Sequence, residues 1–202
     1  MNSPRTLPWD WYEGTVPGNV SVHETAYLES AYSFRLYRNQ DEEGLTIGSG
    51  AAVYNGTMFD VGQHGKVRIG TYAVINPAWF ICDELIEVGD YSLIAWNVVL
   101  MDTYRISLQP SQRRFELQQL PKRSPRRIES PSSARAIRIQ QNVWIGFDSC
   151  VLPGVTIGEG SVIGARSVVA SDIPPFTMAA GNPARPIRKF SQEERHHGIN
   201  KN

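Results

Sequence analysis

The sequence predicts an all-β solenoid of stacked parallel strands, and three observations carry this prediction. Aliphatic residues recur at every sixth position toward the C-terminus, at Ile139, Ile145, Val151, Ile157, Ile163 and Val169. Glycine follows the aliphatic residue at positions 146, 158 and 164, and serine recurs at positions 149, 161 and 167. Such a period fits neither the roughly 3.6-residue period of a helix nor simple alternation along a strand. It fits a chain that turns a corner in every hexad, so that three hexads close a triangular coil and stacked coils bury a continuous core.

The hexad residues other than the aliphatic one indicate how the corners are built. Glycine is expected where a tight corner favours a residue without Cβ, and serine where only a small side chain fits. The same register recurs upstream and predicts about six coils, with these inward-facing residues: Val16, Val22, Leu28 and Phe34; Ile47, Val53 and Phe59; Ile69, Ile75 and Ile81; Val88, Ile94 and Leu100. The register breaks at 35–46, 62–68 and 102–138, where loops are expected to leave the solenoid.

The chain therefore divides into three parts. An aromatic segment at 1–15, with Trp9-Asp-Trp-Tyr12, is expected to pack over one end of the solenoid or on a neighbouring molecule. The solenoid spans 16–173 and is interrupted by a basic loop at 102–138. The tail at 174–202 contains Ser191-Gln-Glu-Glu194, a capping signal for a short helix that would shield the last coil.

Composition narrows the function classes. The 20 basic and 20 acidic residues balance, so overall charge gives no attraction to nucleic acid or to an anionic membrane. No apolar run has the length of a membrane span and no secretory signal is visible. Cys82 and Cys150 lie in predicted strands and are expected to be reduced core or lining residues of a cytoplasmic protein, and no residues show metal-ligand spacing.

Residues 142–188 carry the most specific motifs: Asn142-Val-Trp-Ile-Gly146, Pro153-Gly-Val-Thr-Ile-Gly158 and Gly181-Asn-Pro-Ala-Arg-Pro-Ile-Arg188. They resemble the hexapeptide-repeat acyltransferases, above all the sugar O-acetyltransferases of the maltose, galactoside and colanic-acid type. The resemblance implies a left-handed parallel β-helix, a homotrimer with each site between two neighbouring prisms, acetyl-CoA as donor and a hydroxyl of a sugar or glycan precursor as acceptor. It also implies direct attack on the thioester.

The resemblance extends to donor-binding positions. Gly146 and Ala165 match residues that contact the pantetheine of CoA, and Arg185 and Arg188 match residues that meet its phosphates. Arginine suits this role because it makes paired, charge-assisted hydrogen bonds to phosphate. Trp144 matches an aromatic residue of the site wall in some relatives. The alternative for the two arginines is a solvated tail.

The sequence departs from the family at the catalytic base. Acyl transfer to a hydroxyl needs a base near the acceptor oxygen, usually an imidazole. The family carries this histidine in a segment such as Thr-Gly-His, whereas the chain reads Asp102-Thr-Tyr-Arg-Ile-Ser107, and no histidine lies between His64 and His196. A family member that has lost catalysis and serves as a binding or scaffold protein is therefore the alternative. A zinc enzyme like the γ-carbonic anhydrases would need three histidine ligands, which the repeat does not offer.

Two residues are candidates for the missing base. Asp102 and Asp83 are each the third residue of a hexad at the same corner, and their carboxylates are expected to stack about 5 Å apart, which would raise one pKa. His64 occupies the same hexad position as Arg105, two coils away, at about 10 Å along the axis. Asp102 could instead cap a turn, and His64 could be a plain loop residue. The resemblance to sugar acetyltransferases places Asp83 near the position that binds the acceptor hydroxyls, and Asn76 is a further candidate for acceptor binding.

The stretch 103–138 is strongly basic. Its nine cations are Arg105, Arg113, Arg114, Lys122, Arg123, Arg126, Arg127, Arg135 and Arg138, against Glu116 and Glu129, which gives a net charge of 9 − 2 = +7. One hypothesis is a lid that attracts an anionic ligand at a neighbouring subunit's site, as the resemblance suggests. The other is a flexible, solvated loop with Ser124-Pro125 and Ser130-Pro-Ser-Ser.

Overall fold

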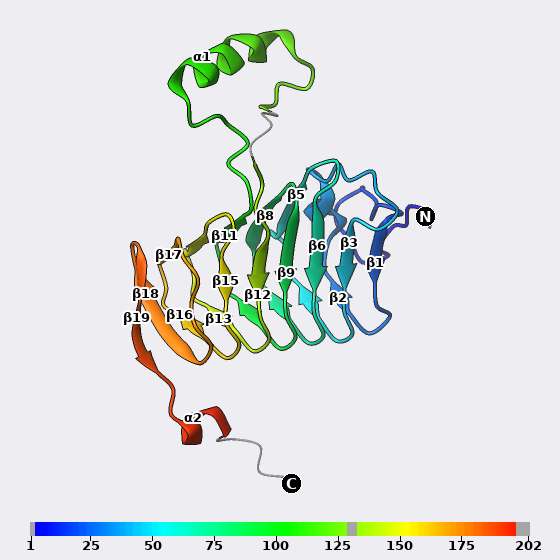
Figure 1. The fold of residues 1–202 in the computed structure, drawn as a ribbon. Helices are drawn as coiled ribbons and strands as arrows, with labels where there is room; N and C mark the ends of the chain where they lie inside the picture. The colour runs from blue at the N-terminus through cyan, green and yellow to red at the C-terminus, as the bar shows by residue number, and fades with distance from the viewer. Residues whose placement is uncertain (1–2, 129–132, 197–202) are drawn as a thin grey trace.

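The chain forms a left-handed parallel β-helix of six coils in a computed structural model that describes residues 3–128 and 133–196 (Figure 1). The predicted fold is confirmed. The first sheet contains β1 (Val20–Val22), β3 (Leu45–Ile47), β6 (Lys66–Ile69), β9 (Leu85–Val88), β12 (Ile137–Ile139) and β15 (Thr156–Ile157). The second contains β2 (Tyr27–Leu28), β4 (Ala52–Val53), β7 (Val74–Ile75), β10 (Leu93–Ile94), β13 (Trp144–Ile145), β16 (Val162–Ile163), β18 (Thr177–Gly181) and β19 (Ala184–Lys189). The third contains β5 (Met58–Val61), β8 (Ala78–Cys82), β11 (Val98–Met101), β14 (Cys150–Val151) and β17 (Val168–Val169).

The core is a stack of apolar side chains to which all three sheets contribute, and some strands bury two of them, as β6 does with Val67 and Ile69. In the second sheet, for example, Ile94 pairs with Ile75 on one side and Ile145 on the other, and all three are fully buried. The third sheet of the first coils holds aromatic residues instead. Phe34, in the 3-10 helix η1 (Ala31–Phe34), lies 5.5 Å from Phe59 between ring centroids. Because each inward position repeats in the next coil, burial continues along the whole axis.

The predicted register is wrong at one place. Ile81 was expected to face inward, but the structure buries Phe80 instead and leaves Ile81 only partly buried. The corner at Asn76-Pro77 is one residue shorter than the others, so Phe80 pairs with Phe59 and Leu100. Every later residue of this coil moves by one position as a result.

The corner glycines have a different role from the one expected. Gly146, Gly158 and Gly164 do not have positive φ; left-handed backbone occurs two residues further on, for example at Asp148 (φ 57°). Glycine is required because neighbouring coils approach closely: a Cβ on Gly146 would lie 2.6 Å from the backbone N of Ala165. The corner serines are buried as predicted, and Ser161 Oγ donates to Pro174 O at 2.8 Å.

The two ends of the solenoid are covered differently. At the N-terminal end, Asp10 accepts a hydrogen bond from Ser30 Oγ at 2.8 Å, and Tyr12 packs on the core and edge-on against Tyr32. The aromatic segment therefore packs on its own first coil. At the other end, the β18–β19 hairpin extends the second sheet, and α2 (Gln192–His196) lies outside the prism (Figure 1). The predicted capping box is present, and α2 contacts the side of the last coil, where Arg195 lies 4.5 Å from the centre of the Phe176 ring.

The basic stretch forms an arm that projects from the prism (Figure 1). It contains α1 (Pro110–Gln119) and the 3-10 helix η2 (Leu120–Lys122). Proline at the first helical turn and a run of good helix formers explain α1, which was not predicted. Glu129 and Ser130, which belong to this basic stretch, lie outside the residues that the structure describes.

Candidate active site

The predicted catalytic residues lie at the corner where the chain passes from the third sheet to the first. This third-to-first corner is formed by the turns after β5, β8 and β11. The turn after β5 packs on the next coil, because Gly62 N donates to Cys82 O at 2.7 Å and Lys66 N donates to Glu84 O at 2.9 Å. His64 and Asp83 are thus on adjacent coils at the same corner.

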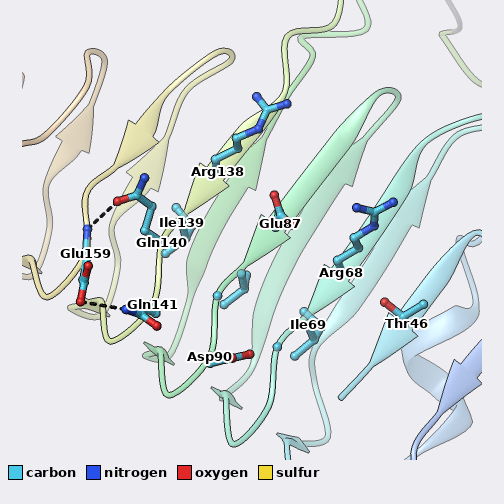
Figure 2. A pocket seen from close by; sticks show the side chains of 13 residues that line it. Thr46, Arg68, Ile69, Glu87, Asp90, Arg138, Ile139, Gln140, Gln141 and Glu159 are labelled. Atoms are coloured by element: carbon cyan, nitrogen blue, oxygen red, sulfur yellow. Dashed lines mark hydrogen bonds between the residues drawn. The ribbon is translucent and has the colours of Figure 1, made fainter. Parts of the chain in front are cut away.

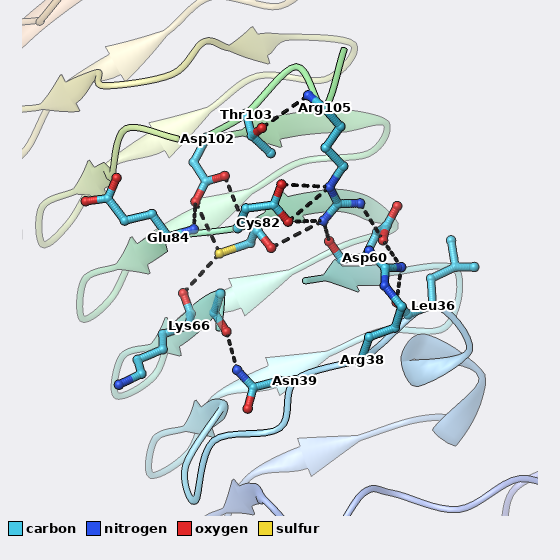
Figure 3. A network of polar contacts seen from close by, with 12 residues as sticks. Leu36, Arg38, Asn39, Asp60, Lys66, Cys82, Glu84, Asp102, Thr103 and Arg105 are labelled. Carbon is cyan, nitrogen blue, oxygen red and sulfur yellow. Dashed lines mark hydrogen bonds and ion pairs between the residues drawn. The ribbon is translucent and has the colours of Figure 1, made fainter. Parts of the chain in front are cut away.

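Arg105 is the centre of a charged cluster at this corner (Figure 3). Its Nη1 lies 2.6 Å from Asp60 Oδ1, and its Nε and Nη2 donate to the Asp83 carboxylate at 3.1 and 2.9 Å. Arg38 also contacts Asp60, at 2.9 Å. Burial disfavours the charged guanidinium, but the hydrogen bonds to Asp83 and Asp60 outweigh this effect and raise the pKa of Arg105. Arg105 is therefore a charged clamp between carboxylates.

Arg105 lies in the segment Asp102–Ser107, in which the resemblance leads one to expect the catalytic histidine and the sequence has none. A guanidinium does not lose its proton in proteins, so Arg105 cannot accept one from a hydroxyl. The sequence therefore departs from the family in this segment, because it has an arginine that cannot act as a base and no histidine.

Asp102 does not have the geometry of a base, which corrects the prediction. Its side chain is fully buried, and it accepts hydrogen bonds from the backbone N–H groups of Asp83, Glu84 and Leu85 at 2.8, 2.8 and 2.9 Å (Figure 3). Burial raises the pKa of the Asp102 carboxyl, partly offset by these donors, but no substrate can reach it. Asp102 caps the turn, as its alternative assignment held.

The predicted stack of two carboxylates is also absent, for a reason that lies in the register. Met101 pairs with Ile81, so the next residue, Asp102, falls level with Cys82 in the inward-facing row. Cys82 Sγ lies 3.4 Å from Asp102 Oδ2. Asp83 follows on the outer side, where Arg105 neutralises it. Carboxylate repulsion from Asp83 is the smallest contribution to the raised pKa of Asp102.

His64 has the accessibility that Asp102 lacks. Its side chain is 73% exposed, and its Nδ1 lies 3.0 Å from Asp41 Oδ1. Asp41 belongs to the loop that crosses this corner from the first coil, and Lys66 Nζ is 3.8 Å from its other oxygen. An imidazole held at one nitrogen and open to solvent at the other has the form of a general base.

The two remaining acceptor candidates lie elsewhere. Asn76 sits at the corner between the second and third sheets, where its Nδ2 donates to Ile94 O at 3.1 Å. Trp144 is half exposed on the outer face of the second sheet. The structure therefore does not bring Asn76 or Trp144 to the corner that holds His64 and Asp83.

The predicted donor positions form a separate corner, between the second and third sheets. Gly146 and Ala165 occupy this second-to-third corner on adjacent coils, and Gly146 N donates to Ile163 O at 2.8 Å. Ala165 is exposed. Gly146 is buried between the coils, so it is Ala165 that lies open at this edge, next to the half-exposed Phe147.

The two predicted phosphate ligands lie on β19. Arg185 is exposed, and its Nη1 donates to the neighbouring Ala184 O. Arg188 makes a two-point ion pair with Glu194 of α2, with both N–O distances 2.9 Å, and stacks on Phe190 at 4.7 Å. Arg188 thus already has an anionic partner within the chain.

A polar groove of about 650 Å³ runs over the outer face of the first sheet (Figure 2). Arg68, Glu87 and Arg138 alternate in charge along it, at paired positions of β6, β9 and β12. The groove contains none of the predicted site residues. An alternating row on a flat sheet face is an ordinary solvated surface, so we do not assign the reaction to it.

Sequence reasoning missed two important side chains at the third-to-first corner. The sequence analysis did not single out Asp60, which follows Phe59 in its hexad, and it included Asp41 only within the loop at 35–46. The alternation around Phe59 indicates that Asp60 points outward, but only the fold shows that Arg105 reaches back to it. Asp41 lies in a loop outside the hexad repeat, so the repeat gives no expectation for where its side chain points.

Residues 3–128 and 133–196 offer neither a metal-binding cluster nor a membrane-spanning helix. No group of three or more His, Cys, Asp or Glu residues there could hold a metal ion. No helix in these ranges has the length and apolar character needed to cross a membrane.

Comparison with known proteins gives consistent matches. The sequence profile described as "Bacterial transferase hexapeptide (six repeats)" matches residues 136–171. Over 152 residues the chain is 35% identical to galactoside O-acetyltransferase of Escherichia coli (strain K12), which covers 75% of the chain and 67% of that protein. A segment of 57 residues is 68% identical to a Schizosaccharomyces pombe protein named as an acetyltransferase, and it makes up only 28% of each protein.

A solved structure is similar as well. The chain matches a hexapeptide-repeat acetyltransferase of Vibrio cholerae complexed with acetyl coenzyme A, with a TM-score of 0.60 and 28% identity. The match covers 72% of this chain and 71% of that one. The similarity therefore includes most of the solenoid and reaches beyond the C-terminal hexads.

Proposed function

The chain belongs to the hexapeptide-repeat acyltransferases, whose co-substrate is acetyl-CoA, and we propose that it acetylates a hydroxyl of a sugar or glycan precursor. The observation that carries this proposal is the second-to-third corner, where the exposed Ala165 stacks on the buried Gly146 at the positions that the resemblance assigns to the donor groove. The sugar acceptor is supported by the similarity to galactoside O-acetyltransferase. A cytoplasmic location is part of the proposal, and both cysteines are free, as it requires.

The donor would lie along the second-to-third corner. Its pantetheine would contact Gly146 and Ala165, with Trp144 as part of the wall. Arg185 and Arg188 would meet the phosphates, because guanidinium groups bind phosphate oxygens through paired, charge-assisted hydrogen bonds. Arg188 would exchange Glu194 for a phosphate in this step.

The acceptor would lie at the third-to-first corner, with His64 as the base. In the reaction, the acceptor hydroxyl oxygen attacks the thioester carbonyl carbon while the imidazole takes the hydroxyl proton. The C–S bond then breaks, and the thiolate of CoA recovers that proton. Asp83, fixed by Arg105, would accept a hydrogen bond from an acceptor hydroxyl. Asn76, on another corner, is supported only by the family resemblance.

Donor and acceptor corners lie on opposite edges of the third sheet within one chain. A homotrimer of parallel prisms would bring the donor corner of one chain against the third-to-first corner of its neighbour. The projecting arm, with half-exposed Phe115 and Leu117, leaves the prism at the third-to-first corner and would reach toward the neighbouring chain in such a trimer.

Calorimetric titration with acetyl-CoA and CoA tests the donor site first. We expect saturable, micromolar binding at about one site per chain, that is, roughly 8 kcal/mol of binding free energy. Acetyl-CoA turnover with a panel of sugars follows, with thiol release as readout. Binding without turnover on any sugar would contradict the enzyme and leave a binding or scaffold protein; no binding at millimolar ligand would contradict both the donor site and the reaction.

A further inference from the structure

We propose that Asp41 is a positioning residue for catalysis: it fixes the ring and tautomer of His64 so that Nε2 is presented to the acceptor. This inference rests on the proposed function, in which His64 is the base that the segment Asp102–Ser107 does not supply. It adds a residue from a loop outside the hexad repeat to the catalytic machinery.

The contact itself defines the tautomer. Asp41 Oδ1 lies 3.0 Å from His64 Nδ1, and a carboxylate only accepts hydrogen bonds, so Nδ1 carries the proton. In the neutral ring the lone pair is then on Nε2, on the far side of the imidazole. Because the His64 side chain is 73% exposed, this nitrogen is free for an incoming hydroxyl.

The loop around Asp41 is fixed at both ends of its crossing. Arg38 N donates to Val61 O and Gln40 N donates to Gln63 O, so the loop continues the backbone pairing beyond the end of β5. Asn39 Nδ2 donates to Gly65 O at 2.7 Å, on the other side of the His64 turn. The loop and the turn therefore form one unit.

Asp41 is also held individually. Its backbone N donates to Asn39 Oδ1 at 2.9 Å, and its carbonyl accepts from Asn19 Nδ2 at 2.9 Å. An exposed ion pair without such support contributes little to stability, because holding both side chains in one geometry costs conformational entropy. Here the backbone of one partner is fixed before the pair forms, which makes the contact suited to orienting the ring.

The charged groups that face the imidazole agree with this role. Asp41 is beside Nδ1, Lys66 is within 3.8 Å of the other oxygen of Asp41, and Asp83 lies on the coil against which the turn packs. The hydrogen bond from His64 is the main cause that lowers the pKa of Asp41. The carboxylate consequently stays charged, and able to accept, through the pH range in which an imidazole acts as a base.

A double-mutant cycle tests the proposal. We compare His64→Ala, Asp41→Asn and the double variant with the unchanged chain in steady-state acetyl transfer. Asp41→Asn is expected to lower kcat by about 10- to 100-fold, as is usual for groups that orient a histidine, with KM for acetyl-CoA unchanged. In the His64→Ala background, Asp41→Asn is expected to add nothing, because its effect passes through the ring.

The matched control is Glu42→Gln, which removes the same charge from the adjacent exposed residue and should leave kcat unchanged. Nitrogen-15 NMR of the histidine rings gives a readout independent of rate: the Nδ1-protonated form should dominate in the unchanged chain and lose its predominance in Asp41→Asn. Thermal unfolding verifies that all variants fold.

The outcomes separate the two proposals. Full activity of His64→Ala would remove His64 as the base, and the role of Asp41 with it. An inactive His64→Ala with a normal Asp41→Asn would overturn the positioning role and leave the proposed function intact. Equal losses from Asp41→Asn with and without His64 would show a general structural effect and also overturn the inference.

Discussion

At the scale of single residues, Asp102 has a structural role in place of the catalytic role that was predicted for it. Its carboxylate is enclosed by the turn at Asp83–Leu85, whose three N–H groups have their partner in it. A buried donor left without a partner costs about 1–3 kcal/mol. The turn that carries Asp83 to the surface therefore depends on Asp102.

This argument predicts a stability change. Asp102→Ala should lower the free energy of unfolding by about 3 kcal/mol or more, whereas Asp102→Asn, which keeps one carbonyl-type acceptor, should lower it by less. Urea unfolding of both variants measures the difference. Acetyl-CoA affinity should stay constant in Asp102→Asn, since the donor corner is on the other edge of the sheet. Equal stability of all three proteins would contradict the capping role.

At the scale of secondary-structure elements, the contact between β19 and α2 competes with the proposed donor. Arg188 is held by Glu194, and this pairing lowers the pKa of Glu194 to about 2. Because the pKa in the folded state is depressed, the pairing contributes stability above the ordinary carboxyl pKa and loses it as the pH falls through about 2. The pair is thus intact at every pH at which the enzyme would work.

Removing Glu194 should therefore strengthen CoA binding. Glu194→Gln is expected to raise the affinity for CoA only about two- to fivefold, because an exposed ion pair contributes little. Pantetheine, which lacks the phosphates, should bind equally to both proteins. Glu193→Gln, the next residue of the same helix, is the control for the charge change. If CoA binds equally to Glu194→Gln and to the unchanged chain, Arg188 does not receive a phosphate.

The elements also show how far the sequence could predict the structure. The hexad period defined six coils, because an inward position must be apolar in every coil. The one shortened corner, at Asn76-Pro77, was invisible to a fixed period, and it misplaced Asp83 relative to Asp102. Helix α1 was missed because the solenoid register ends before it. The Asp41–His64 contact joins a loop and a turn, both outside the repeat, so no spacing rule applies to it.

At the scale of the whole molecule, the proposed site is divided between two edges of the prism. His64 and Asp83 lie at the third-to-first corner, and Gly146 and Ala165 lie at the second-to-third corner. The third sheet separates these corners within a chain. In the proposed homotrimer a complete site would need two copies, each of which contributes one corner, and a closed ring of three copies would contain three such sites.

Mixed assemblies test this arrangement directly. One chain carries His64→Ala and the other carries Arg185→Ala with Arg188→Ala, so each is defective at a different corner. A site is intact only where the second chain supplies the base and the first supplies the donor groove. With equal, random mixing in co-expressed rings, this occurs at about a quarter of the sites, so activity should recover to about a quarter of the unmutated level. Each variant assembled alone should stay inactive. Absence of recovery in verified mixed rings would place both corners' functions within one chain and contradict a shared site.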